Sequence, residues 1–344
     1  MPRRWISSAL VVACACKPGD GTGPQTHYTP PPGVNMADPQ APITGIAAFE
    51  AAWTSPAIRS STGLASLVVL PAGVAPAGAP QCGAGNAAAP SLSPLGVIPD
   101  SDFVRIFVYD STTAKFQAGP TGGGPAGGVE FILPAIDSLN RVLYPFQNAG
   151  TLDLFDVSPI EGPLTLHGVI TGTAGNGSAD YTMTDTGTAT AHAGVLAGRV
   201  AGAGRVFTFR DTLSVLFQQV KANATIADSG RGAQMRLIAT RTQSDLFDYF
   251  YDLDFTFTSS GQRVRLLGSI TVYCLIPSTS LTVTVNDSDF ALVNTGATGP
   301  VITSLADSAV TPAQDSAIRA LIRGQNELFG WLNALAQPTS KFLP

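Results

Sequence analysis

Few residues in this chain could act as a general base. It has three histidines, His27, His167 and His192. His27 lies in a Pro- and Gly-rich stretch, whereas His167 and His192 lie in segments with the composition of β-strands. The chain has no HExxH, P-loop or GxSxG motif, and no GxGxxG that follows a clear strand. We therefore expect no catalysis and no cofactor. A secreted hydrolase with a Ser-His-Asp site, assembled only on folding, is the less favoured alternative.

Two acidic clusters could hold a hard cation such as Ca²⁺, which takes carboxylate and carbonyl oxygens. One lies on a single face of an expected strand and the other in an expected turn. Neighbouring Arg263 and Arg265 could equally compensate this charge. Because neither cluster has the Gly and Glu positions of an EF-hand, we favour arginine pairing or solvation and predict no metal site. The calcium candidates are Asp248, Asp252, Asp254, Asp287 and Asp289.

The N-terminus has the order of a secretory signal peptide. Arg3 and Arg4 form a basic start, Trp5–Val12 is mostly apolar, and small residues and cysteine follow. The apolar run is far shorter than the ~20 residues that a membrane-spanning helix needs. Residues 1–13 are therefore predicted to direct export and to be removed.

The junction after this segment resembles that of bacterial lipoproteins. Val11-Val12-Ala13-Cys14 fits their cleavage motif, whereas Cys16 fits it less well because Ala13 replaces an aliphatic residue. The resemblance implies that Cys14 is lipidated and anchors the protein to a membrane of the bacterial cell envelope. An ordinary secretory signal, cut near Ala13 or Ala15, is the alternative. Residues 14–42 are rich in Pro and Gly and predict an extended tether.

Two further cysteines, Cys82 and Cys274, lie far apart in the chain. In an oxidising compartment they are predicted to form a disulfide bond, with two buried free thiols as the alternative. The chain has no paired CxxC motifs and no Cys/His cluster, so a structural zinc site is disfavoured.

Composition limits the partners. Charged residues make up only 12% of the chain, about half the usual share, and the formal net charge is −5. Basic residues form no cluster along the sequence, so we expect no nucleic-acid partner, because such binding needs concentrated positive charge.

The pattern of elements predicts an all-β fold. Ile43–Trp53 has the composition of a short helix, but from Val129 onward strand-like segments follow one another without helices between them. This spacing indicates an antiparallel sandwich or barrel-like sheet over residues 43–310. Two sandwiches, with a seam at Gly172–Gly177, are the alternative.

The clearest hairpin spans Leu246–Ile276. Apolar and polar residues alternate on both of its strands, and we expect a four-residue loop that pairs Phe257 with Gln262 and places Asp254 opposite Arg265. The aromatic face between Phe247 and Phe257 is interpreted as core, with the wall of an apolar ligand cavity as the alternative.

The chain is predicted to end in an amphipathic helix over residues 311–336. Thr311 and Gln314 form a capping box with Pro312 at the first helical position, and an apolar stripe follows. We expect this helix to cover the sheet; a partner-binding helix is the alternative.

These observations favour a lipid-anchored, extracytoplasmic envelope protein with a structural or binding role. Its expected partners are the membrane and either another envelope protein or an apolar small molecule. The alternative function is a carrier that holds an apolar ligand in a β-barrel or in a cavity between sheet and helix.

Overall fold

The computed structural model describes residues 34–63, 98–113, 115–137, 141–159, 162–186, 191–216, 219–245, 248–273, 276–296, 299–305 and 308–340. Three α-helices lie in these ranges: α1 (Gln40–Trp53), α2 (Pro56–Gly63) and α3 (Pro312–Ser340). Cys14, Cys82, Cys274 and His27 lie outside the described residues, so the lipid anchor and the disulfide bond stay predictions.

Fifteen strands form a single sheet. They are β1 (Arg105–Asp110), β2 (Lys115–Thr121), β3 (Gly128–Pro134), β4 (Asn148–Asp156), β5 (Leu164–Gly172), β6 (Ser178–Asp185), β7 (Ala191–Gly202), β8 (Arg205–Leu216), β9 (Gln219–Asp228), β10 (Gln234–Asp245), β11 (Asp248–Ser259), β12 (Gln262–Tyr273), β13 (Ile276–Val285), β14 (Ser288–Gly296) and β15 (Gly299–Ser304). A 3₁₀ turn, η2 (Thr173–Gly175), joins β5 to β6.

The strand order follows the chain from β3 to β15, and only β1 and β2 depart from it by lying beyond β3. Neighbours are antiparallel except β1 and β3, which are parallel. The predicted all-β fold with antiparallel pairing and a C-terminal helix is confirmed. The sheet continues through the seam considered at Gly172–Gly177, because β5 and β6 pair on both sides of it.

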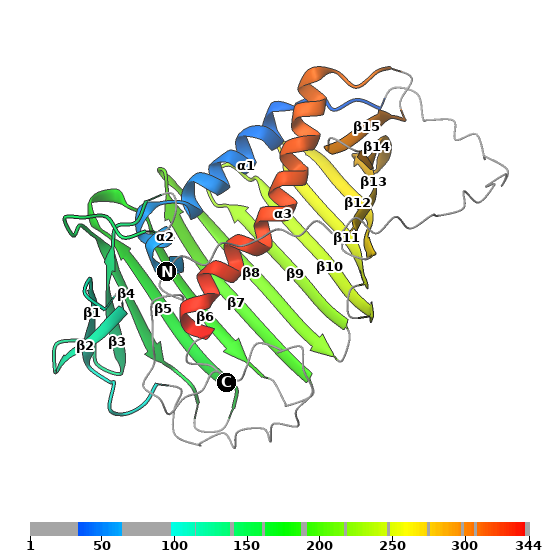
Figure 1. Cartoon of the computed structure of the whole chain (residues 1–344). Coiled ribbons are helices and arrows are strands. Elements are labelled where there is room, and N and C mark those ends of the chain that lie inside the picture. Colours follow the sequence, from blue (N-terminus) through cyan, green and yellow to red (C-terminus); the bar gives the residue numbers. More distant parts are fainter. Residues whose placement is uncertain are drawn as a thin grey trace.

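Figure 1 shows α1 and α3 running across the same face of the curved sheet. We call this the covered face and the opposite one the open face. Phe49 and Trp53 of α1 contact Phe207 of β8, with ring centroids 4.5 and 6.2 Å apart, and Trp331 of α3 stacks on Trp53. The main core therefore lies between the helices and the covered face. Among the described residues, no helix has both the length and the apolar character needed to cross a bilayer.

Helix α3 begins as the sequence predicts. The backbone N–H of Gln314 donates to Thr311 Oγ1, and the backbone N–H of Thr311 donates to Gln314 Oε1. This reciprocal pair satisfies donors that the first helical turn leaves free. The apolar stripe of α3 faces the core, where Ile318, Leu321 and Leu328 are buried.

The register of the β11–β12 hairpin differs by two residues from the prediction. Phe257 pairs with Val264 instead of Gln262, and Thr256, not Asp254, lies directly opposite Arg265. The reason is a shorter turn: Ser260 and Gly261 both have positive φ, at +50° and +78°, which is typical of two-residue hairpin turns. Because side chains alternate with period two, a shift of two residues leaves every side chain on its predicted face.

Candidate binding surface on the open face of the sheet

The open face over the middle strands carries arginine and threonine in a regular row. The direct cross-strand partners in this row are Arg210, Thr225, Arg236, Thr256 and Arg265, one from each strand from β8 to β12. Adjacent strands lie ~4.8 Å apart, so the three arginines recur at intervals of roughly 10 Å. Helices α1 and α3 lie on the other face of the sheet (Figure 1), and Arg210 and Arg236 of this row are exposed.

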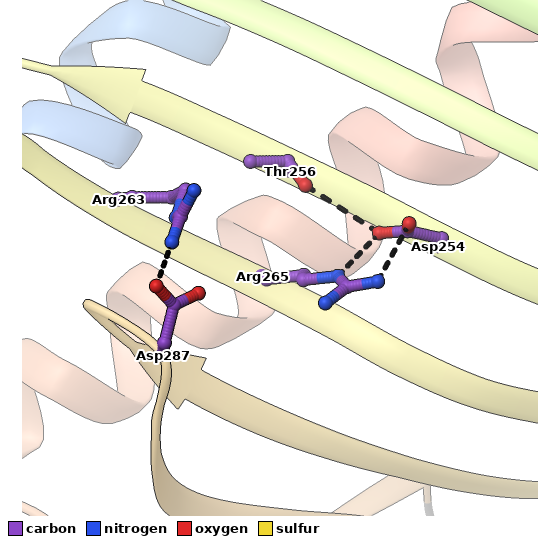
Figure 2. A network of polar contacts seen from close by, with 5 residues as sticks. All are labelled: Asp254, Thr256, Arg263, Arg265 and Asp287. Carbon is purple, nitrogen blue, oxygen red and sulfur yellow. Dashed lines mark hydrogen bonds and ion pairs between the residues drawn. The ribbon is translucent and has the colours of Figure 1, made fainter.

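Two ion pairs hold Arg265, at one end of the row, and Arg263 on the same strand (Figure 2). Arg265 donates from Nε to Asp254 Oδ1 at 2.6 Å and from Nη2 to Oδ2 at 2.8 Å. This bidentate pair of hydrogen bonds raises the pKa of Arg265 above its ordinary value. Arg263 donates to Asp287, which lies in the turn between β13 and β14. Both guanidinium groups are thereby held in position.

A hollow of about 360 Å³ lies beside these pairs, and we call it the arginine hollow. Its lining residues are Gln234, Arg236, Thr256, Thr258, Arg263, Arg265 and Asp287. Within the described chain Arg236 is exposed and forms no ion pair or hydrogen bond through its side chain. Because Arg263 and Arg265 already have aspartate partners, Arg236 supplies the uncompensated positive charge of the hollow. Together with the threonine hydroxyls and the Gln234 amide, it offers hydrogen-bond donors to an anionic group.

The calcium candidates do not converge on one another. Asp254 and Asp287 pair with Arg265 and Arg263, in agreement with the arginine-pairing interpretation. Asp252 and Asp289 are on β11 and β14, and the side chain of Asp248 lies outside the described part. No group of three or more His, Cys, Asp or Glu residues suited to a metal ion occurs in the ranges that the structure describes.

His167 lies on the open face of β5, distant along the sheet from the arginine hollow. Its Nε2 is 2.9 Å from Asp180 Oδ1, and its ring stacks on Phe155 at 5.7 Å. Asp180 also accepts a hydrogen bond from Arg199 at 3.3 Å. The described partners of His167 are therefore a carboxylate and an aromatic ring, and not a serine or threonine hydroxyl. The side chain of His192 is not described; its backbone belongs to β7.

Two aspartates have strongly raised pKa values. Burial raises the pKa of Asp211 on β8 to about 6, although a backbone N–H donated by Thr212 partly offsets this. Burial also raises the pKa of Asp153 to about 6, and its cross-strand neighbour Glu130 adds a like charge. Asp211 shares the covered face with Phe207 and Phe209, so its carboxyl lies in apolar surroundings.

The described end of the aromatic strand face considered as a cavity wall belongs to the core. Leu253, Phe255 and Phe257 of β11 are buried in the cluster that includes α1 and α3. A Cβ atom added to Gly45 of α1 would lie only 2.6 Å from Cζ of Phe257, so helix and ring are in direct contact.

Sequence reasoning singled out Arg263 and Arg265 but missed Arg236 and Gln234. The alternation in β10 places both on the polar face, but only the pairing of β10 with β11 brings them beside Thr256 and Thr258. Comparisons of the chain with models of known protein families, with curated proteins and with solved structures found no match.

Proposed function

We propose that this protein is a lipid-anchored, non-catalytic binding protein of the bacterial cell envelope. Its open face holds an anionic group of its partner in the arginine hollow. The observation that carries the proposal is Arg236, an exposed arginine without an ion pair in the described structure, beside two arginines that aspartates hold in place. A guanidinium binds carboxylate, sulfate or phosphate through charge-assisted hydrogen bonds.

The arginine hollow is tested with a probe that carries only anionic groups. We expect Arg236→Gln to weaken binding of a short polyphosphate by about tenfold at low salt, because hydrogen bonds to charged groups each contribute ~1.5–3 kcal/mol. Fluorescence titration of the purified full chain with labelled polyphosphate measures this.

Arg210→Gln is the matched control. Arg210 lies in the same row, is exposed and has no ion pair in the described chain, but it is outside the hollow. Both substitutions remove one charge from the open face. An equal loss of binding in the two variants would mean that the probe senses only overall charge, and the proposed site would be wrong.

The membrane anchor follows from the lipoprotein-like motif before Cys14. Cys14→Ser is expected to move the protein from the membrane fraction to the soluble fraction, because the acyl chains attached to this residue supply ~0.8 kcal/mol for each buried CH₂. Fractionation of bacteria that express the full chain measures the change.

Cys16→Ser serves as the control and should stay with the membrane. Mass spectrometry of the mature N-terminus provides the second readout. An unacylated N-terminus, or one that begins at a residue other than Cys14, would contradict the proposed anchor.

A further inference from the structure

A second hollow of about 530 Å³ adjoins the arginine hollow on the open face. It is lined by β10 to β13, of which β10, β11 and β12 also line the arginine hollow. Asp254 of the second hollow pairs with Arg265 of the arginine hollow and so lies between the two. Thr240 and Asp252 of this hollow are four residues along their strands from Arg236 and Thr256. At ~3.3 Å per residue, the two groups are separated by roughly 13 Å. An occupant of both hollows must therefore be an extended chain.

The second hollow combines exposed apolar groups with hydroxyls and carboxylates. Phe250 is 41% exposed and Leu267 is 40% exposed, although both lie on the polar face of the sheet. Around them are the hydroxyls of Ser269, Ser280 and Thr282. Asp252 is exposed and forms no side-chain interaction in the described part, so its carboxylate is available as an acceptor.

This combination matches the chemistry of a neutral sugar ring. A pyranose has an apolar C–H face, which can lie against Phe250, and a rim of hydroxyls, which can donate to Asp252 and exchange hydrogen bonds with serine and threonine. An acyl chain fits poorly, because it would bury the carboxylate of Asp252 without a hydrogen-bond partner. A polymer that is anionic at every unit would meet repulsion from this carboxylate, which no arginine compensates in the described part.

We infer that the partner of the open face is an oligosaccharide in which acidic and neutral sugars alternate. The carboxylate of an acidic sugar occupies the arginine hollow, and a neutral sugar lies on Phe250 in the second hollow. This inference rests on the proposed function, because it uses Arg236 as the anchor of the acidic sugar.

The test uses a hyaluronan hexasaccharide, in which glucuronate and N-acetylglucosamine alternate, and isothermal titration with the purified full chain. We expect the carboxyl-reduced, uncharged hexasaccharide to bind about tenfold more weakly than the acidic one, because it lacks the groups that Arg236 recognises. Phe250→Ala should weaken the acidic hexasaccharide by about tenfold and leave polyphosphate binding unchanged.

Two controls separate this inference from the proposed function. Phe250→Tyr keeps the ring and should bind the hexasaccharide as tightly as the wild type does. Val301→Ala truncates another exposed apolar residue, on β15, and should leave hexasaccharide binding unchanged. If Phe250→Ala leaves hexasaccharide binding intact while Arg236→Gln weakens both probes, the sugar inference is wrong and the arginine hollow stands. If Arg236→Gln affects neither probe, the proposed function itself fails.

Discussion

Phe257→Ala is expected to lower the free energy of unfolding by about 3–5 kcal/mol, the cost of truncating a fully buried phenylalanine. Phe257 is only 1% exposed and lies beneath α1, where Gly45 allows the helix backbone to approach the ring. The truncation therefore leaves a cavity at the contact between helix and sheet. Urea unfolding followed by circular dichroism measures the loss as a lower midpoint.

Gly45→Ala provides an internal control, because its effect on the free energy of unfolding should change sign when Phe257 is replaced. In the wild-type background the new methyl group would lie 2.6 Å from the ring, so the variant should be destabilised despite the ~1 kcal/mol that alanine gains over glycine within a helix. In the Phe257→Ala background the same methyl group fills empty space and should stabilise. If Gly45→Ala has the same effect in both backgrounds, the helix does not rest on the ring.

Asp211→Asn is expected to raise the free energy of unfolding at pH 8 by on the order of 2 kcal/mol and to change it little at pH 4. The pKa of Asp211 is about 6 in the folded chain and ~3.9 in the unfolded chain. As the pH rises from about 4 to 6, the unfolded state loses its proton first, so stability falls through this window. Asparagine keeps the shape of the protonated acid and cannot ionise.

The measurement is urea unfolding of both proteins at the two pH values. Asp252→Asn removes the same formal charge from an exposed position and controls for the change in net charge. A less stable Asp211→Asn variant at pH 8 would show that the ionised carboxylate makes a favourable contact, in contradiction to its buried Oδ1, which lacks a hydrogen-bond partner within the described chain.

Local patterns predicted the type of each element better than its pairing. The alternation around Asp254 and Arg265 placed both on one face, and their ion pair lies there. The turn length was missed because Ser260 adopts a positive φ, which non-glycine residues seldom do. The sequence did not predict that all strands join in one sheet. This depends on which strands pair, for example β5 with β6, and the alternation within a single strand does not determine its partners.

The residues of the arginine hollow also differ in whether local sequence or strand pairing reveals them. Arg263 and Arg265 were recognisable because they follow the acidic strand directly, whereas Arg236 joins them only through the pairing of β10 with β11. Asp211 is recognisable from the sequence alone. It continues the alternation of Phe207 and Phe209, which places a carboxyl on the apolar face of β8.

The sequential strand order has a consequence for how such a chain can change in length. From β3 to β15 every strand pairs with its neighbours in the chain, so an inserted or deleted hairpin alters only the pairing at its own position. An even number of strands also leaves the direction of every later strand unchanged. The two helices set the limit, because α1 and α3 come from opposite ends of the chain and meet where Gly324 contacts Ile46. Sheet width can therefore vary in units of one hairpin only as far as these helices still meet.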